Sequence, residues 1–299
     1  MYATVIGESN IDITVVPQSD ANSGGCTPSH IIFHHGGVAR NIAHNLCLLG
    51  HKVRLMSIFG GDDFSTRLID DCKRIGMDLS LSTRLKDEKS PVFLSFNDTT
   101  GNLKTGFSDI ALNGKMDLAW LKGKISEINR SDVVVADTLL SAEALAFLID
   151  HCVVPLYIDT VSPGKAIRFS EAQKTTKRHS VLAIKSNLIE ALSLTGKNDA
   201  TEAAKTLNHN GVNQVYLTLG AQGALHCAES ISTHFPSLPA TIKNVTGSGD
   251  AFFAGIIHAH SKGKNGKLAV PYGLEAAKIT LECMEPVNPA LKLQLDQQD

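Results

Sequence analysis

The sequence predicts an α/β fold in which helices cover a mostly parallel central sheet. Short apolar runs of strand length alternate with longer segments of helical period, and this alternation is typical of successive βαβ units. Strands buried on both faces read as continuous apolar runs, as Val133–Ala136 and Val181–Ile184 do. Two segments, residues 11–35 and 91–108, interrupt the alternation, and we expect them to form a small β-structure outside the parallel layer.

The individual elements follow from their length and periodicity. The predicted strands are short and rich in β-branched residues, and they are Thr4–Ile6, Val53–Ile58, Val133–Ala136, Leu156–Ile158, Val181–Ile184 and Val215–Leu219. The predicted helices carry apolar residues three and four positions apart, and they are Val38–Leu49, Phe64–Ile75, Ser141–Asp150 and Thr201–Asn210. A further helix begins near Gly247 and continues through the apolar run Ala251–Ile257.

The two interrupting segments read as paired strands. The first holds apolar runs around the turn Ser23-Gly24-Gly25, and the second is a hairpin closed by residues 97–101. The chain contains no internal repeat and no convincing linker. We therefore predict a single domain over residues 1–299, with 11–35 and 91–108 as inserted β segments.

Composition excludes several classes of protein. With 43% apolar residues, 19% charged residues and a formal net charge of -2, the chain suits a globular protein and has no electrostatic basis for binding nucleic acid. No window reaches the length of a membrane span, and the N-terminus lacks the features of a signal peptide. The six cysteines form no C-x-x-C pair, which favours reduced, packed thiols. We expect a cytoplasmic protein with a small-molecule substrate.

The most informative motif is the run Asn-Val-Thr-Gly-Ser-Gly-Asp at residues 244–250. Gly247 and Gly249, with Ser248 between them, let the backbone turn tightly and direct N–H groups outward at the positive end of a helix. This arrangement predicts an anion hole. Asp250 follows directly, and as an ionised carboxylate it can take a proton from a substrate hydroxyl. The alternative is a helix start that Asp250 merely caps.

A second group of motifs suits a hydroxylated ligand. Gly36 and Gly37 allow close approach of the backbone, and Asn41 follows one turn into the helix. Asn10 and Asp12 lie two positions apart, so their side chains point to one side and can chelate a vicinal diol at a strand end. Each motif also occurs in ordinary turns.

Two further motifs suit a magnesium nucleotide. Asn187 and Glu190 are three positions apart at a helix start, a spacing that fits oxygen ligands of Mg²⁺, direct or through waters, and equally a capping box. Thr218, Gly220 and Gly223 form a glycine loop that fits a nucleotide lying against the backbone, or a plain hairpin.

In this order, the segments resemble the ribokinase-like (PfkB) family of carbohydrate and nucleoside kinases over nearly the whole chain. Two motifs carry the resemblance as a pair, Gly36-Gly37-x-x-x-Asn41 and Thr246-Gly247-Ser248-Gly249-Asp250. The resemblance implies a ribokinase-like three-layer α/β/α sandwich with a small β lid made by the two inserted segments. It also implies ATP and Mg²⁺ as cofactors and, in many relatives, a monovalent cation such as K⁺ and a homodimer formed through the lid.

The resemblance also implies roles for single residues. Asp250 matches the catalytic base, and the backbone of Gly247, Ser248 and Gly249 matches the anion hole. The residues that match the acceptor site are Asn10, Asp12, Gly36, Gly37 and Asn41. The residues that match the nucleotide and magnesium sites are Asn187, Glu190, Thr218, Gly220 and Gly223. Asp109, Asp137 and Lys165 are further candidates for base or ribose contacts, with turn residues and a solvated charge as the alternative.

Within the family, several passages are similar to the sub-family of pseudouridine kinases, namely residues 36–43, 134–137, 154–162, 244–247 and 288–289. This similarity implies transfer of the ATP γ-phosphate to the 5′-hydroxyl of pseudouridine. The chain departs from the usual family pattern at His35, Ser186 and Ser248, and none of the three removes a catalytic group. Another acceptor, such as ribose, a ribonucleoside or a hexose, and a non-catalytic sensor of nucleosides or sugars remain alternatives.

Overall fold

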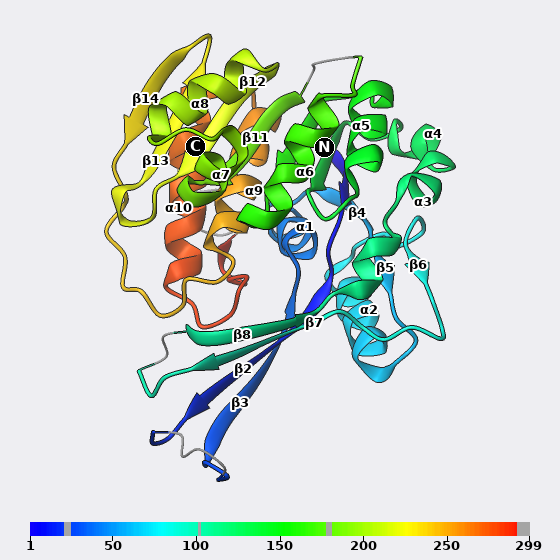
Figure 1. Cartoon of the computed structure of the whole chain (residues 1–299), viewed down its shortest axis with the longest axis vertical. Coiled ribbons are helices and arrows are strands. Elements are labelled where there is room, and N and C mark those ends of the chain that lie inside the picture. The colour runs from blue at the N-terminus through cyan, green and yellow to red at the C-terminus, as the bar shows by residue number, and fades with distance from the viewer. Residues whose placement is uncertain (21–24, 101–102, 178–180, 292–299) are drawn as a thin grey trace.

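The computed structural model describes residues 1–20, 25–100, 103–177 and 181–291. Its body has three layers, with a large sheet between two layers of helices, and a smaller sheet extends away from the body as a lid (Figure 1). The predicted fold class, a ribokinase-like α/β/α sandwich with a β lid, is confirmed.

The central sheet has eight strands. Their order across the sheet is β14 (Ile231–Phe235), β13 (Ala224–Ala228), β12 (Val212–Thr218), β11 (Val181–Asn187), β10 (Leu156–Asp159), β9 (Val133–Asp137), β1 (Tyr2–Ile6) and β4 (Lys52–Met56). Neighbouring strands from β12 to β4 are parallel, and β13 and β14 pair antiparallel at one edge. Because the parallel strands end at one side of the sheet, the loops that follow them meet there.

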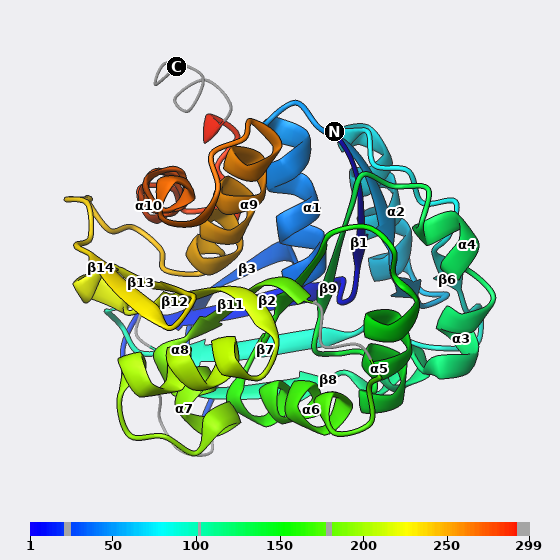
Figure 2. The ribbon, with the colours of Figure 1, turned by 90° about the horizontal axis from the view of Figure 1, so that it is seen from above.

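Helices cover both faces of this sheet (Figure 2). One layer contains α1 (Val38–Leu48), α2 (Asp63–Ile75), α9 (Ser248–Ser261) and α10 (Val270–Leu281), and the other contains α5 (Ala142–His151), α6 (Pro163–Gln173), α7 (Leu188–Thr195) and α8 (Ala200–His209). Alternate strand residues enter the two cores, as Val133 and Val135 of β9 do on one side and Val134 and Ala136 on the other. Two short helices, α3 (Leu118–Lys122) and α4 (Ile125–Ile128), pack at one end.

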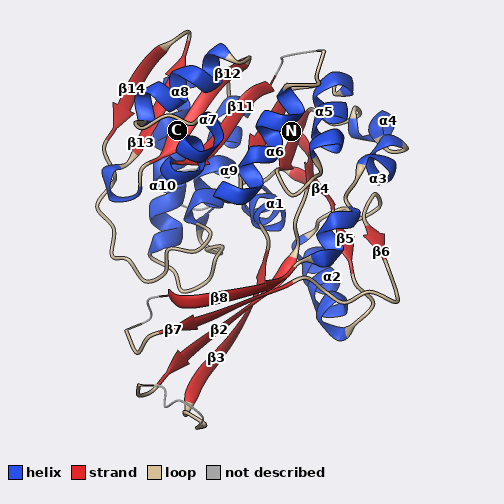
Figure 3. Cartoon of the chain, viewed as in Figure 1, coloured by secondary structure: helices blue, strands red, loops and turns tan. Residues whose placement is uncertain are grey.

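The two inserted segments combine into one four-stranded lid (Figure 3). Its strands are β3 (Ser29–Gly36), β2 (Asn10–Pro17), β7 (Val92–Asn97) and β8 (Leu103–Asp109), in that order. The pairs β2–β3 and β7–β8 are antiparallel, as predicted, while β2 and β7 join the hairpins in parallel. Of the predicted turns, Ser23, Gly24 and Gly101 lie outside the described residues.

One predicted strand is two in the structure. The segment Val53–Ile58 divides at Ser57 into β4 and β5 (Ile58–Phe59), and β5 pairs with β6 (Thr83–Arg84) in a separate two-stranded sheet. The break occurs because the backbone N–H of Ser57 bonds the side chain of Ser82 and not a strand neighbour. All six cysteines are described and none forms a disulfide. Among the described helices, none is long and apolar enough to cross a membrane.

Candidate active site

The start of α9 is a backbone site open to an anion. Gly247 precedes the helix with φ 80°, a left-handed conformation that favours glycine, and no described side chain caps the helix. A side chain at Gly247 would not fit, because its Cβ would lie 2.0 Å from the carbonyl oxygen of Pro286. The first N–H groups of a helix have no partner within the helix. In α9 the N–H of Ser248 makes a hydrogen bond of 3.4 Å to the carbonyl oxygen of Val245. The N–H groups of Gly249 and Asp250, at the positive end of the helix, are therefore the ones placed to bind a negatively charged group.

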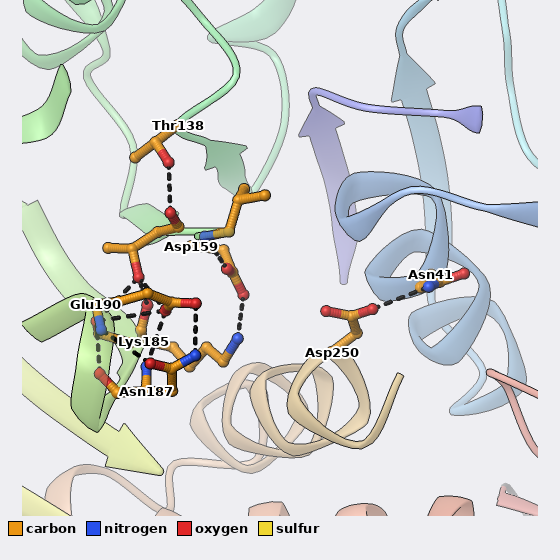
Figure 4. A network of polar contacts seen from close by, with 10 residues as sticks. Asn41, Thr138, Asp159, Lys185, Asn187, Glu190 and Asp250 are labelled. Atoms are coloured by element: carbon orange, nitrogen blue, oxygen red, sulfur yellow. Dashed lines mark hydrogen bonds and ion pairs between the residues drawn. The ribbon is translucent and has the colours of Figure 1, made fainter. Parts of the chain in front are cut away.

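Asp250 lies in the first turn of the same helix and is only 7% exposed. Its Oδ2 accepts a hydrogen bond from Nδ2 of Asn41 in α1 at 2.9 Å (Figure 4). Burial raises the pKa of Asp250 to about 7, while the charge of Lys185 opposes that rise and Asp159 adds to it. Burial thus opposes the ionisation that the sequence alone led us to expect. A group with such a pKa is well matched to accept a proton near pH 7.

Arg40 holds the amide that contacts Asp250. Its Nη1 donates to Oδ1 of Asn41 at 3.3 Å and to the backbone oxygen of His35 at 3.0 Å, and its Nη2 donates to Asp71 at 2.7 Å. Because Oδ1 of Asn41 faces a donor, its Nδ2 must face Asp250. The sequence motif ends on Asn41 but gave no role to Arg40, whose other two partners lie in the lid strand β3 and in α2.

Asn10 and Asp12 lie at the base of the lid strand β2. Asn10 Nδ2 donates to Asp12 Oδ1 at 2.8 Å, so the two side chains share one side, as expected. Gly36, opposite Asn10 in β3, packs against them, since a Cβ there would lie 2.2 Å from Asp12 Oδ2. Within the described chain, the buried atoms Asn10 Oδ1 and Ser9 Oγ have no hydrogen-bond partner. Such orphaned polar atoms fit a ligand that supplies hydroxyl groups.

The other acceptor candidates differ in position. Asp137 is fully buried at the end of β9 and accepts hydrogen bonds from the backbone N–H groups of Glu8 and Leu139. Lys165 at the start of α6 is near enough for its charge to act on Glu8. Asp109 is exposed, and the strand register places it on the lid face opposite the one that carries Asp12. The structure therefore brings Asp137 and Lys165 near Glu8, two positions before Asn10, and places Asp109 on the other lid face.

A buried charge network lies beside α9 (Figure 4). Lys185 Nζ bonds Asp159 Oδ2 at 3.0 Å, and both groups are buried. Although burial disfavours the ammonium ion, Asp159, Glu190 and Asp250 raise the pKa of Lys185, so it stays charged. Its Nζ would lie 3.0 Å from a Cβ at Gly249, which places a cation directly behind the anion hole. In the sequence, the only signal for this buried cation was a lysine that directly follows the apolar strand Val181–Ile184.

Asn187 and Glu190 form a capping box at the start of α7. Asn187 Oδ1 accepts from Glu190 N, and the carboxylate of Glu190 accepts from Asn187 N, Asn187 Nδ2 and Thr160 Oγ1. Both carboxylate oxygens are thus engaged inside the protein. Among the described residues, no group of three or more His, Cys, Asp or Glu side chains is placed to hold a metal ion. Direct coordination of Mg²⁺ by Glu190 does not fit these contacts, and the water-mediated form remains a prediction.

A cavity of about 450 Å³ adjoins the anion hole. Thr218, Gly220 and Gly223 line one part of it, and Ser248 and Gly249 line another. Much of the remaining lining is apolar and comes from Leu238, Ile242, Phe252, Leu274 and Leu281. β12 and β13 are antiparallel neighbours, so the loop that joins them, residues 219–223, closes a hairpin and also lines the cavity. The combination suits a nucleotide, with its base among apolar side chains and its phosphates at α9.

Two histidines attach the lid strand β3 to the body. His34 Nδ1 lies 2.7 Å from Glu285 Oε2, and His35 Nδ1 lies 2.9 Å from Asp71 Oδ2. His34 is also the strand partner of Asp12 and lies on the same lid face. His35, which departs from the family pattern, therefore contacts α2 at the lid base and lies on the face away from Asp12.

Comparison with known proteins agrees with this geometry. A family model described as pfkB family carbohydrate kinase matches residues 2–293. The chain is 28% identical to a pseudouridine kinase of Escherichia coli strain K12, over 98% of this chain and 94% of that protein. It is also 28% identical to an uncharacterized sugar kinase of the same strain, over 97% of this chain and 81% of that protein. The structure of an Arabidopsis thaliana ribokinase complexed with ribose and ATP superimposes with a TM-score of 0.79 at 18% identity, covering 98% of this chain and 97% of that chain.

Proposed function

The chain belongs to the PfkB family of carbohydrate kinases, and we propose that it transfers the γ-phosphate of ATP to the 5′-hydroxyl of pseudouridine. Kinases of this family use ATP, typically with Mg²⁺. The observation that carries the proposal is the juxtaposition of Asp250, held by Asn41, with the uncapped start of α9 beside the nucleotide-sized cavity. The likeness to a pseudouridine kinase over nearly the whole chain supports the choice of acceptor.

In the proposed mechanism, the protein positions groups and stabilises charge. ATP, when bound, supplies the phosphoryl group. Asp250 takes the proton from the acceptor hydroxyl, and Asn41 keeps the carboxylate oriented toward that hydroxyl. The N–H groups that follow Gly247 hold the negative charge of the transferred group, and Lys185 reinforces them from behind. Asn10 and Asp12 hold the diol, and the lid keeps out water that could otherwise accept the phosphoryl group.

Other acceptors in the same family would use the same transfer groups. Ribose, another ribonucleoside or a hexose would also present a hydroxyl to Asp250, so the choice among them depends on contacts at the lid and on the far side of Asp12. A non-catalytic sensor would need neither a buried base with a pKa near 7 nor a cation behind an anion hole. These two features favour a kinase over a sensor.

A panel of acceptors tests the proposal directly. We expect kcat/KM for pseudouridine to exceed the values for uridine, ribose and fructose by at least about 10-fold, because a hydrogen-bonding site rejects ligands that leave its polar groups unpaired. Phosphate transfer from labelled ATP, followed by chromatography of the product, measures this ratio. A higher kcat/KM for another member of the panel would replace pseudouridine as the acceptor.

The lid offers a surface for a second copy of the chain. Phe33, Ile13, Leu94 and Phe107 face one another across all four strands, on the face opposite Asp12. Five large apolar side chains of the lid are exposed by 39–61%, namely Ile31, Phe33, Phe96, Leu103 and Phe107. A continuous apolar face of this kind marks an interaction surface, and self-association buries it symmetrically. We propose a homodimer formed through these faces.

Replacement of one apolar lid residue tests the dimer. We expect the wild type to be dimeric and Phe33→Asp to weaken association by at least about 10-fold, because the change buries a charge in an apolar interface. Light scattering coupled to size-exclusion chromatography measures the mass. Ser108→Asp, an exposed position on the opposite lid face, is the matched control and should remain dimeric. A monomeric wild type would contradict the proposal.

A further inference from the structure

A second cavity, of about 400 Å³, lies where the base of the lid meets α1, α2 and the loop formed by residues 285–289. It shares no lining residue with the cavity beside the anion hole, and neither Asn41 nor Asp250 lines it. Its volume is in the range of pockets that hold small organic ligands. The proposed phosphoryl transfer makes no use of this space, so its lining indicates what else the chain binds.

Three arginines from two helices line this cavity. Arg67 and Arg74 lie seven positions apart on α2, two helical turns and therefore on one face, and Arg40 lies in the first turn of α1. Asp71 and Glu285 are the carboxylates of the lining. The guanidinium groups thus outnumber the carboxylates, and the three histidines of the lining can only add positive charge. The cavity is therefore suited to an anion.

These basic side chains have donors that the protein does not use. The side chain of Arg40 is only 5% exposed, and its Nε is buried without a hydrogen-bond partner in the described chain. One turn later in α1, the buried Nδ1 of His44 also has no partner there. Arg67 is exposed and makes no hydrogen bond or ion pair with any described residue. Buried polar atoms of this kind cost free energy unless a ligand or water pairs with them.

Asp71 fixes the other donors of the cavity in place. Its Oδ2 accepts a hydrogen bond from Arg40 Nη2 at 2.7 Å and lies 2.9 Å from His35 Nδ1. Its Oδ1 accepts a hydrogen bond from Arg74 Nη2. One carboxylate therefore meets two guanidinium groups and an imidazole. Its negative charge is more than compensated, and positive charge remains for a ligand.

The remainder of the lining is apolar. Ile11 of the lid, Phe64 of α2 and Val287 of the 285–289 loop supply this surface. Guanidinium groups from separate elements suit a phosphate group, because phosphate presents oxygens in several directions and each guanidinium can bind it through two N–H groups. A bare phosphate ion would leave the apolar part of the cavity uncovered, whereas a phosphate ester would cover it.

We propose that this cavity binds a phosphate monoester of a small organic molecule, at a site separate from the nucleotide and acceptor sites. The phosphate group lies among Arg40, Arg67 and Arg74, where it supplies the acceptors that their free N–H groups lack. The organic part lies against the apolar lining. The inference does not depend on which acceptor the kinase uses, because the cavity contains none of the transfer groups.

Calorimetric titration with uridine 5′-monophosphate tests the inference. The protein is first saturated with Mg²⁺ and a non-hydrolysable ATP analogue, so that phosphate binding at α9 does not contribute. We expect a Kd below about 1 mM for the wild type. The double variant Arg67→Gln/Arg74→Gln should raise this Kd by at least about 10-fold, because it removes charge-assisted hydrogen bonds. Arg40 is left in place, since it also holds Asn41.

The matched control is the double variant Lys73→Gln/Arg130→Gln. It also removes two exposed positive charges, but neither residue lines the cavity. Arg130 is 73% exposed and pairs with a carboxylate three positions away, as Arg74 does at 76% exposure. The control should keep the Kd within about twofold of the wild type, because exposed charges outside the cavity contribute little. Thermal unfolding curves show whether both double variants are folded.

Uridine and inorganic phosphate separate the two parts of the ligand. Uridine lacks the phosphate group, so its affinity should be the same in the wild type and in Arg67→Gln/Arg74→Gln. Inorganic phosphate should bind at least about fivefold more weakly than the monoester, because it gains nothing from the apolar lining. An equal affinity for inorganic phosphate, lost in the same variant, would assign the cavity to free phosphate and overturn the monoester.

Three other outcomes would overturn the inference. These are a wild-type Kd for uridine 5′-monophosphate above about 1 mM, a Kd that Arg67→Gln/Arg74→Gln leaves within about twofold, and an equal loss of affinity in the control variant. If the chain transfers no phosphate to any acceptor, the proposed function fails. The difference between the two double variants then still decides whether the cavity binds the monoester.

Discussion

Replacement of Asp250 by asparagine should lower kcat by at least about 100-fold while fold and ligand affinity remain. The amide has the size of the carboxylate and can still accept a hydrogen bond from Asn41, so the local packing is kept. It cannot take a proton, and loss of a general base costs about 100- to 10,000-fold. Steady-state kcat, with ATP and acceptor affinities from calorimetry, separates lost chemistry from lost binding.

The matched control is Asp63→Asn. Asp63 also lies in the first turn of a helix, α2, but it is exposed and outside the site. Its replacement removes a carboxylate from a helix start and should leave kcat within about twofold. The pH dependence gives a second criterion. Because the pKa of Asp250 is raised to about 7, wild-type kcat/KM should fall about 10-fold for each unit by which the pH drops below 7. A variant that keeps near-normal turnover, or this pH dependence, would rule out Asp250 as the base.

The elements predicted from the sequence are those whose signal is local. Val133–Ala136 and Val38–Leu49 were found because their own residues carry the strand or helix pattern. The helix α10 was missed, since Pro271 and Gly273 in its first half are poor helix signals. Gly273 is required there by tertiary packing, because a Cβ would lie 2.8 Å from the ring of Phe252 in α9. No pattern within one segment reveals a contact of that kind.

The same distinction applies to the site. Gly247 to Asp250 and Gly36 to Asn41 are contiguous, so turn, anion hole and polar side chain could be predicted together. Arg40, Lys185 and Glu8 were given no role, because each acts through partners far away in the sequence. Arg40 joins the lid to Asn41, Lys185 reaches Gly249 from another strand, and Glu8 meets Asn113. The kinase chemistry was thus predictable, whereas the contacts between distant residues that support the site could be identified only in the folded structure.

The second large effect is expected at the anion hole, where Gly247→Ala should lower kcat by at least about 100-fold. The added Cβ would lie 2.0 Å from the Pro286 carbonyl oxygen, so the start of α9 or the loop of Pro286 must move. The backbone N–H groups that follow would then no longer point at the transferred group. Loss of one such donor costs about 100- to 1,000-fold in kcat in enzymes that use an oxyanion hole. Steady-state kinetics measures the loss, and a thermal unfolding curve measures the accompanying change in Tm.

Gly263→Ala separates the clash from the general cost of a left-handed residue. Gly263 has φ 77°, close to the 80° of Gly247, but a Cβ there meets nothing within 4 Å. Its replacement should cost about 1 kcal/mol of stability and leave kcat unchanged. If the two variants lose a similar amount of stability, kcat should therefore fall far more in Gly247→Ala than in Gly263→Ala. Equal kcat values in folded Gly247→Ala and Gly263→Ala would contradict this prediction. They would show that the loop of Pro286 moves without disturbing the start of α9, so that the anion hole does not depend on the close contact at Gly247.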